Sequence, residues 1–372
     1  MLNDGWLHMG NKIIITGGLG YIGSHTIVEL KDMYDEFIII DNLANSDISV
    51  VDILEELTQK KIIHYNLSIN DEINLKEVFK EHLPLNIIHF AGLKSVQESE
   101  EYPEKYFFTN VVGTVSLLNA IKDFKCDNFI FSSSATVYGK PLYLPYDELH
   151  STLPINNYGR SKLIAEQLIR QWALINNVST LSLRYFNPVG AHTSGSIGEK
   201  ATGIPNNLMP FILEVISGSI EKLKVFGNDY DTKDGTGERD YIHVVDLAKA
   251  HISALIYTKE KKVNDVINIG TGTSISVLEI INTFKDSLST NIEYEIADRR
   301  AGDLPKYYSS TKKANKLLKS IRNNYYDDLI SFEIIFPIPS YFLFNKKTYH
   351  LIIEFNSNRK INFINDIKKK SS

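Results

Sequence analysis

The sequence predicts an α/β protein with a doubly wound parallel sheet and a smaller α/β lobe in its C-terminal half. Short apolar runs, such as Ile13–Ile15 and Phe37–Ile40, alternate with helical stretches. Runs that are apolar on both faces are typical of strands in a parallel sheet that helices cover on both sides. After about residue 187 the alternation becomes less regular and the chain richer in polar loops, which indicates the second lobe.

Composition narrows the functional classes. At 372 residues and 43% hydrophobic content, the chain can form one large or two ordinary domains. Its net charge of -5 lacks the basic excess that nucleic-acid binding requires, so a small ligand is favoured. The single cysteine, Cys126, excludes an internal disulfide and a thiolate metal cluster, and it fits a reducing compartment. The segment Met1–His8 has no basic flank or long apolar run, so we expect no secretory signal.

The first strand and helix carry a glycine-rich turn. Gly17, Gly20 and Gly23 follow the run Ile13–Ile15 and precede a helical stretch. Glycines at this spacing permit a sharp turn and let a pyrophosphate approach the helix N-terminus. Asp41 ends the second strand, where a carboxylate accepts both ribose hydroxyls and repels a 2'-phosphate. The pattern therefore favours NAD over NADP.

The next segments repeat the strand and helix pattern. Helices are expected over residues 70–82 and from about Tyr102 to Phe124, with a strand near residues 86–90 between them. His89 lies inside that strand, where a packed histidine is more common than a catalytic one, and we assign it no chemistry. A further buried strand over residues 128–131 runs into Ser132–Ser134, a cluster that either caps a turn or places a hydroxyl near a substrate.

Tyr158 and Lys162 open a predicted helix that runs to about Trp172. Residues four apart lie on one helix face, so the phenol and the ammonium can meet. A neighbouring cation favours the phenolate and is expected to lower the Tyr158 pKa. Tyr158 is therefore a candidate general acid and base.

The C-terminal half is predicted to form shorter elements. We expect a strand over Leu181–Tyr185, a helix after Asn206, a short strand over residues 224–227 and a helix over residues 245–257. Arg239, Arg299 and Arg300 fall in this half. Guanidinium groups hold a diphosphate with two parallel hydrogen bonds, so these arginines are candidate ligands for one.

Together these features resemble the extended short-chain dehydrogenase/reductases that act on nucleotide sugars, and longer strings are similar to those of the UDP-glucose 4-epimerases. The resemblance covers about Asn11 to Leu318. The strings are Phe90-Ala91-Gly92-Leu93-Lys94, Ser132-Ser133-Ser134-Ala135-Thr136-Val137-Tyr138-Gly139, residues 184–192 (RYFNPVGAH), 205–210 (PNNLMP), 226–230 (FGNDY) and 234–244 (DGTGERDYIHV).

The resemblance implies a Rossmann-type NAD-binding domain over residues 11–186 and a UDP-sugar-binding lobe over residues 187–318, with the chain crossing between them. Residues 1–10 are then a leader and 319–372 a tail. It also implies interconversion of UDP-glucose and UDP-galactose in galactose metabolism. Oxidation and re-reduction at C4' of the sugar would pass through a 4-keto intermediate. A cytoplasmic homodimer, without nucleic-acid or membrane partners and without a metal, is expected.

Site residues carried over from the family fall into three groups. The catalytic set is Tyr158, Lys162 and Ser134, with Tyr158 exchanging the proton of the 4'-hydroxyl. The NAD-binding set is Gly17, Gly20, Tyr21, Ile22, Gly23, Asp41, Asn42, Ser68, Ile69, Phe90, Ala91, Gly92, Lys94, Asn110, Tyr158, Lys162 and Tyr185. The substrate-binding set is Ser134, Phe186, Asn187, Asn207, Leu208, Phe226, Arg239, Arg300, Asp303 and Tyr307, in which Tyr307 is expected to crowd a 2'-N-acetyl group.

Two departures from the family pattern leave alternatives open. Ser68 stands where relatives carry an aspartate that contacts adenine, which would weaken NAD binding. After Leu318 the closing helices of the family are absent from the sequence, and Pro337 and Pro339 interrupt the only strongly apolar run of the tail. A catalytically impaired NAD-binding protein is one alternative. A nucleotide-sugar dehydratase is the other, although it would need an acidic pair where Ala135 and Thr136 stand.

Overall fold

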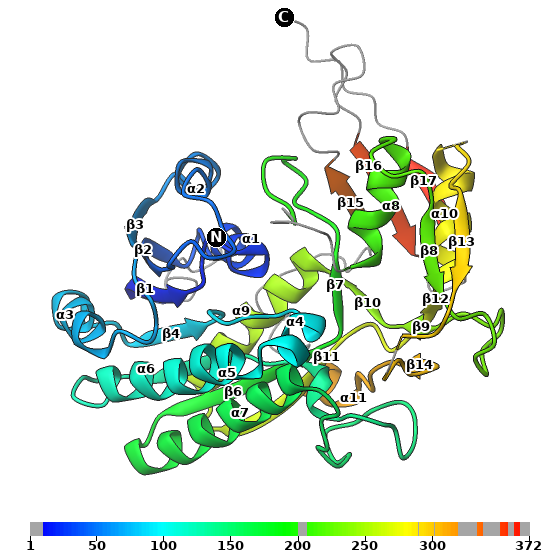
Figure 1. Ribbon diagram of the computed structural model, residues 1–372. Coiled ribbons are helices and arrows are strands. Elements are labelled where there is room, and N and C mark those ends of the chain that lie inside the picture. Colours follow the sequence, from blue (N-terminus) through cyan, green and yellow to red (C-terminus); the bar gives the residue numbers. More distant parts are fainter. Residues whose placement is uncertain are drawn as a thin grey trace, which may run out of the picture.

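The computed structural model describes residues 10–199, 207–288, 290–300 and 302–318, together with the strands over residues 333–337, 350–355 and 361–364. Within these residues one sheet of seven parallel strands has the order β11-β6-β5-β4-β1-β2-β3 (Figure 1). The predicted doubly wound parallel sheet is thus confirmed. Its strands are β1 (Gly10–Thr16), β2 (Tyr34–Ile40), β3 (Lys61–Tyr65), β4 (Asn86–His89), β5 (Asn128–Ser132), β6 (Ser179–Tyr185) and β11 (Asn264–Ile269).

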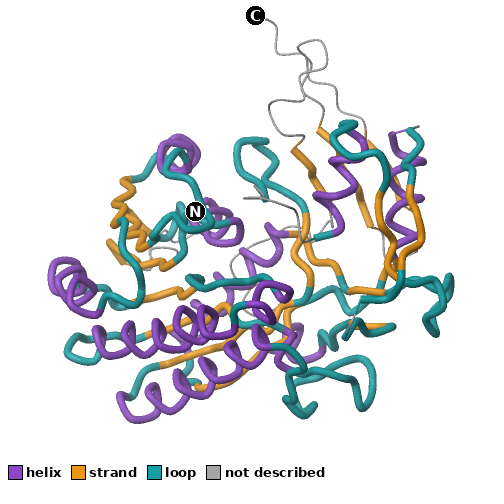
Figure 2. The backbone as a smooth tube through the Cα atoms, viewed as in Figure 1, coloured by secondary structure: helices purple, strands orange, loops and turns teal. Residues whose placement is uncertain are grey.

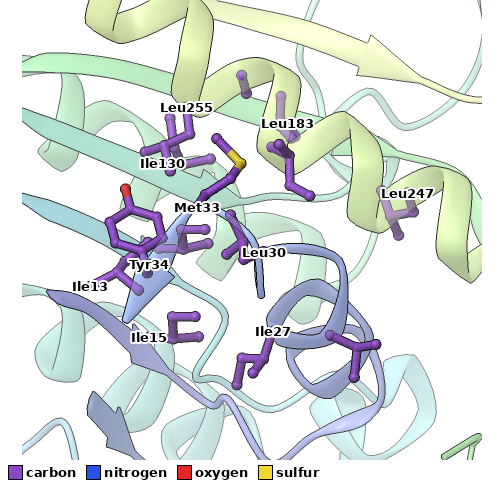
Figure 3. Packing of buried hydrophobic residues seen from close by; sticks show 14 of the residues in the cluster. Ile13, Ile15, Ile27, Leu30, Met33, Tyr34, Ile130, Leu183, Leu247 and Leu255 are labelled. Carbon is purple, nitrogen blue, oxygen red and sulfur yellow. The ribbon is translucent and has the colours of Figure 1, made fainter. Parts of the chain in front are cut away.

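Helices cover both faces of this sheet. Ile13 and Ile15 of β1 pack toward one helical layer and Ile14 toward the other, because successive side chains of a strand point to opposite faces. Figure 3 shows the first layer, where Ile27 and Leu255 approach the sheet. The helices of that layer are α1 (Tyr21–Glu29), α2 (Val50–Thr58) and α9 (Val244–Glu260), and those of the other are α3 (Glu72–His82), α6 (Gly113–Ile121) and α7 (Asn157–Asn176).

The single helix expected over residues 102–124 is divided into three. A π-helical turn, η1 (Phe107–Val112), separates α5 (Pro103–Tyr106) from α6. Such a turn holds an extra residue and often marks a functional site. Here it directs the buried Asn110 inward, toward Leu93 and Ser161. Helical periodicity in the sequence cannot reveal one inserted residue. Short helices α4 (Val96–Glu101) and η2 (Ala135–Val137) complete this half of the chain.

A smaller lobe stands beside the end of the large sheet (Figure 2). Its core packs Ile212, Val225 and Phe284 from two helices and a strand. The strand pairs are β8 with β13, β7 with β10, and β9 with both β12 and β14. These elements are β7 (Asn187–Val189), α8 (Leu208–Ile216), β8 (Leu223–Phe226), β9 (Glu238–Arg239), β10 (Tyr241–His243), β12 (Ile275–Ser276), α10 (Val277–Leu288), β13 (Tyr294–Ala297) and β14 (Lys306–Tyr307). Helix α11 (Lys312–Leu317) instead packs against the core of the large sheet.

After the first elements of the small lobe, the chain returns to the large sheet with α9 and β11. Helix α9 packs beside α1, and β11 pairs with β6 at the sheet edge, although both fall within the 187–318 segment. In the tail, β15 (Glu333–Pro337), β16 (His350–Phe355) and β17 (Ile361–Ile364) form an antiparallel sheet. The leader up to residue 9 and the remainder of the tail lie outside the described residues. Of the helices described, none has the length and apolar character to cross a membrane.

Candidate active site

The predicted cofactor-side residues gather where the parallel strands end. Ligands of such sheets bind beyond the carboxyl ends of the strands. The structure places Gly17, Gly20, Tyr21, Ile22 and Gly23 after β1, Asn42 with Asp41 after β2, Ser68 and Ile69 after β3, Phe90, Ala91, Gly92 and Lys94 after β4, and Tyr185 at the end of β6.

The glycine turn between β1 and α1 has no room for side chains at two positions. A Cβ on Gly23 would lie 2.5 Å from the Gly17 carbonyl oxygen, and one on Gly17 would lie 2.6 Å from the Ala91 nitrogen. Gly17 also has a φ of +68°, which an L side chain rarely adopts. Helix α1 begins without a side-chain cap and without an acid in its first turn. No side chain therefore occupies the N-terminus of α1, and these residues fit the pyrophosphate of a dinucleotide.

Asp41 connects the second strand to this turn. The Asp41 carboxylate accepts a hydrogen bond from the backbone of Leu19 at 3.1 Å. Its other oxygen accepts from Ser46 Oγ at 2.8 Å and from the Leu43 nitrogen at 3.0 Å. The side chain is therefore fixed beside the glycine turn, as the sequence-based assignment to the cofactor ribose requires.

We expect Asp41→Ala to weaken NAD binding and to reduce the preference for NAD over NADP, because the charge that repels a 2'-phosphate is removed. Dissociation constants of both cofactors, measured by calorimetry on cofactor-stripped protein, test this. Asp47→Ala on the same loop is the control, and it should leave the preference unchanged. A wild-type protein that prefers NADP would contradict the assignment.

The candidate catalytic residues converge on one end of the sheet. Tyr158 and Lys162 lie on one buried face of α7. Lys162 Nζ donates to the Ser132 carbonyl oxygen at 3.0 Å, and a Cβ on Gly92 would lie 3.6 Å from Nζ. Ser134 lies close enough to Tyr158 for its hydroxyl to act on the phenol and lower the Tyr158 pKa. Tyrosine, lysine and serine are thus brought together as the sequence predicts.

The expected lowering of the Tyr158 pKa is wrong. Burial, with the neighbouring Tyr185, raises the Tyr158 pKa, and the Ser134 hydroxyl opposes this only in part. Burial also lowers the Lys162 pKa to about 8, although Glu166 acts in the opposite direction. The reason is that both groups leave water, which disfavours the charged form of each. Burial therefore favours the neutral phenol, so Tyr158 must ionise before it can take a proton from a substrate.

His89 is a packed residue, as expected. Its ring nitrogens lie 2.7 Å from Thr16 Oγ1 and 3.2 Å from Thr114 Oγ1, and its ring stacks on Phe131. Burial, together with the Lys162 charge, lowers the His89 pKa to about 3. The imidazole is therefore neutral at physiological pH, and both of its nitrogens already contact threonine hydroxyls.

A buried ion pair beneath the serine cluster was missed in the sequence. Glu166 accepts from Ser133 Oγ at 2.5 Å and from Arg184 Nη2 at 2.7 Å. The Arg184 guanidinium also donates to Tyr138 Oη at 3.1 Å. The pair holds Ser133 in place, and we call the segment Ser132–Ser134 the serine turn. Ser132, next to Ser133, accepts the hydrogen bond from Lys162. The spacing of 158, 162 and 166, one helical turn each, is the signal that would have placed Glu166 on this face.

The substrate-side residues form three groups on the small lobe. Arg239 pairs with Asp303 across 3.3 Å. The Arg300 guanidinium lies 3.9 Å from the centre of the Phe226 ring. Phe186 packs against another ring of the predicted set, that of Tyr307, with the two ring centres 5.1 Å apart. Asn187 lies in β7, while Asn207 and Leu208 begin α8.

Arg299 does not join these groups. Its Nε donates to Asp229 Oδ1 at 2.6 Å, and its guanidinium covers the Tyr230 ring on the exposed side of the lobe. Two further residues lie within the site without having been predicted. Glu199 accepts from Lys94 at 3.0 Å and from Asn207 at 2.9 Å, joining a cofactor-side residue to a substrate-side one. Tyr146 packs on the Tyr307 ring, 4.9 Å between centres.

Comparison with known proteins agrees with this geometry. The model of the NAD dependent epimerase/dehydratase family matches residues 13–270. A UDP-glucose 4-epimerase of Bacillus subtilis (strain 168) is 46% identical over 307 residues, which cover 82% of this chain and 91% of the relative. Two crystal structures of UDP-glucose 4-epimerases are also similar, and each comparison covers 83% of this chain and 92% of the other.

The first of these structures, from Stenotrophomonas maltophila with bound NAD and formylated UDP-arabinopyranose, is 41% identical with a TM-score of 0.80. The second, from Bifidobacterium longum in complex with NAD+ and UDP, is 42% identical with a TM-score of 0.79. The match of the family model extends from the first strand through β11, and so includes the glycine turn, Tyr158 and Lys162. The chain therefore belongs to the NAD dependent epimerase/dehydratase family.

Proposed function

We propose that this protein is an NAD-dependent UDP-glucose 4-epimerase, which interconverts UDP-glucose and UDP-galactose through a 4-keto intermediate. The observation that carries the proposal is the position of Tyr158, Lys162 and Ser134. They lie together at the carboxyl ends of the parallel strands, where the glycine turn also lies. Similarity to UDP-glucose 4-epimerases over 82% of the chain supports the same reaction.

The proposed chemistry uses Tyr158 as the group that exchanges a proton with the 4'-oxygen of the sugar. NAD, when bound, supplies the acceptor for the hydrogen of C4' and returns it. Ser134, whose hydroxyl lies near Tyr158, would orient the 4'-oxygen. The charge of Lys162 stabilises negative charge that develops on the phenol. Tyr158 must be ionised to take the proton of the 4'-hydroxyl in the first half-reaction. Because it gives the same proton back in the second half-reaction and is ionised again, the cycle requires no net proton.

Binding of the UDP portion is assigned to the small lobe. Arg239 and Arg300 are proposed to hold the diphosphate, since guanidinium groups pair with phosphate oxygens. Asp303 would accept a ribose hydroxyl, and Phe226 would pack on the uracil. Asn187, Asn207 and Leu208 are assigned to the same ligand by their place between β6 and α8.

The two alternatives receive less support. In the short helix η2, Ala135 is buried and Thr136 donates to Ser134 at 2.9 Å, so the acidic pair required by a dehydratase is absent from these positions. An impaired NAD-binding protein would have no need of the buried lysine and tyrosine of α7. The described part of the chain retains both, despite the unusual tail.

A homodimer in the cytoplasm is the proposed form of the enzyme. Phe108, Val112 and Val115 lie on the outer side of η1 and α6, and 58%, 45% and 37% of their respective surfaces are exposed. Apolar residues at this spacing form a stripe that a second copy would cover. Light scattering on the purified protein tests the dimer. The single cysteine, Cys126, is buried and in no disulfide, which fits a reducing compartment.

The function is tested by incubating the purified protein with UDP-galactose and measuring UDP-glucose by chromatography. We expect conversion in both directions, without added NAD being consumed. Failure of a folded, NAD-loaded protein to form UDP-glucose would refute the proposal. A product that has lost water would instead favour the dehydratase.

Tyr307 is expected to restrict the sugar to those without a 2'-N-acetyl group. Its ring is wedged against Phe186 and Tyr146, and its buried hydroxyl has no hydrogen-bond partner among the described residues. Tyr307→Cys should therefore raise kcat/KM for UDP-N-acetylglucosamine, because a steric barrier is removed. The control is Tyr308→Cys at the next position, which should not alter the ratio. Equal kcat/KM of the wild type for both kinds of sugar would disprove the assignment.

A further inference from the structure

Asp240 is a fully buried carboxylate at the junction of β9 and β10, and the reaction described above does not use it. Its Oδ1 accepts from the Thr271 nitrogen at 2.8 Å and from Thr271 Oγ1 at 2.7 Å. Its Oδ2 accepts from the Gly272 nitrogen at 3.1 Å, from the Ser309 nitrogen at 3.0 Å and from Ser309 Oγ at 2.7 Å. Five donors thus converge on one side chain.

The backbone of Asp240 also forms hydrogen bonds to two other segments. Its nitrogen donates to the Tyr307 carbonyl oxygen at 3.0 Å, and its own carbonyl oxygen accepts from the Asn187 nitrogen at 3.0 Å. Arg239 precedes it directly. Asp240 therefore joins the three segments that carry Asn187, Arg239 and Tyr307 to the loop after β11, a strand of the large sheet.

The Asp240 carboxylate is closely packed by its neighbours. A Cβ on Gly270 would lie 2.5 Å from Asp240 Oδ2 and 2.5 Å from Ser309 Oγ. Any side chain at Gly270 would therefore push the carboxylate or Ser309 aside. Since Ser309 lies two residues after Tyr307, a shift of the carboxylate moves β14 and the Tyr307 ring with it. Packing this close transmits small displacements instead of absorbing them.

We propose that Asp240 is a positioning residue that sets the distance of Tyr307 and Arg239 from the catalytic Tyr158, and so determines how the sugar is accepted. The inference rests on the proposed epimerase function. The carboxylate is suited to this role because it accepts hydrogen bonds at both oxygens and donates none. It holds the loop after β11 and β14 at one fixed spacing, and the proposed substrate site lies between β14 and the candidate catalytic residues.

Asp240→Asn tests the proposal, because it keeps the shape and turns two acceptor sites into an NH2 group that faces donors. Loss of hydrogen bonds to a charged, buried group should raise KM for UDP-galactose by about tenfold or more, with a smaller change in kcat. The ratio of kcat/KM for UDP-galactose over UDP-N-acetylgalactosamine should change as well, because Tyr307 moves. Ser309→Ala, which removes one donor, should shift both quantities in the same direction by less.

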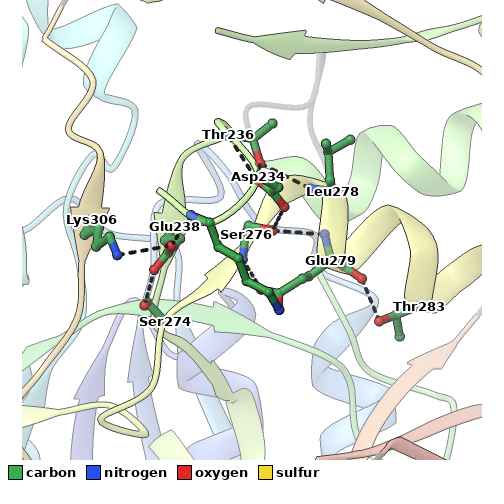
Figure 4. A network of polar contacts seen from close by, with 10 residues as sticks. Asp234, Thr236, Glu238, Ser274, Ser276, Leu278, Glu279, Thr283 and Lys306 are labelled. Carbon is green, nitrogen blue, oxygen red and sulfur yellow. Dashed lines mark hydrogen bonds and ion pairs between the residues drawn. The ribbon is translucent and has the colours of Figure 1, made fainter. Parts of the chain in front are cut away.

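Asp234→Asn is the matched control. Asp234 accepts from the Thr236 nitrogen at 2.9 Å and also binds Ser276, in the neighbouring polar network of Figure 4. Among the described residues, the hydrogen bonds of its side chain go to Thr236 and Ser276 and not to a proposed substrate-binding residue. We expect this variant to lower the Tm while leaving KM and the substrate ratio at wild-type values.

The outcomes separate the two hypotheses. A wild-type protein without UDP-galactose activity refutes the function itself. An active wild type with unchanged KM and substrate ratio in Asp240→Asn and Ser309→Ala refutes the positioning role. Equal shifts in Asp234→Asn would also refute it, because loss of stability alone would then explain the effect. Should Asp240→Asn fail to fold, Ser309→Ala decides.

Discussion

Tyr158→Phe is expected to lower kcat for the conversion of UDP-galactose to UDP-glucose by about 10²-fold or more. The substitution removes the phenolic oxygen that is proposed to exchange a proton with the 4'-oxygen. Packing should change little, because Phe fills nearly the same volume in this buried site, where Tyr158 is 6% exposed. The KM should change less than kcat, since the lost interaction belongs to the transition state.

Tyr106→Phe is the matched control for this prediction. The Tyr106 ring meets that of Tyr158 edge to face, with 6.5 Å between ring centres, and the Tyr106 hydroxyl donates to Glu98 at 2.9 Å. Its removal should leave kcat within a few-fold of the wild type. Circular dichroism and bound NAD, measured on both variants, exclude misfolding as the cause. A folded Tyr158→Phe protein with the wild-type kcat would show that Tyr158 is not the proton-transfer group.

Arg184→Met should lower the free energy of unfolding by about 3–5 kcal/mol, because it leaves the Glu166 carboxylate buried without its partner. Only 7% and 6% of the two side chains are exposed, so water cannot replace the lost contacts. Urea denaturation of the wild type and the variant, followed by circular dichroism, measures the difference. We also expect loss of activity at temperatures where the protein remains folded, since the pair fixes the serine turn at Ser133.

Two further variants make this prediction specific. Lys61→Met breaks the surface pair with Glu36, in which 67% of the lysine side chain is exposed, and should cost about 1 kcal/mol or less. Arg184→Met combined with Glu166→Met removes both charges and should recover much of the stability, because no buried ion is left alone. If Arg184→Met were as stable as Lys61→Met, the buried pair would not hold the serine turn.

Sequence patterns predicted the structure correctly where it depends on residues that are close together in the chain. The run Ile13–Ile15 with glycines behind it predicted β1, the turn and α1, because strand burial and the left-handed Gly17 depend on residues close in the chain. The spacing of Tyr158 and Lys162 predicted one shared helix face for the same reason. Periodicity failed at the π-helical turn η1, where one extra residue changes the direction of Asn110 without changing the composition.

The sequence by itself determined the parallel sheet, the fit to NAD and the identity of the candidate catalytic residues, since short motifs and the alternation of strands and helices specify these. Only the tertiary structure decided the pKa shifts of the buried groups and the hydrogen-bond partners of the buried carboxylates. Burial raises the Tyr158 pKa where sequence spacing predicted a lower one, because desolvation depends on everything packed around the ring. Asp240 meets Ser309 from 69 residues away, and Glu166 meets Arg184 from the next strand. Such contacts exist only after the chain has folded, because no local pattern specifies which distant donor a buried carboxylate will find.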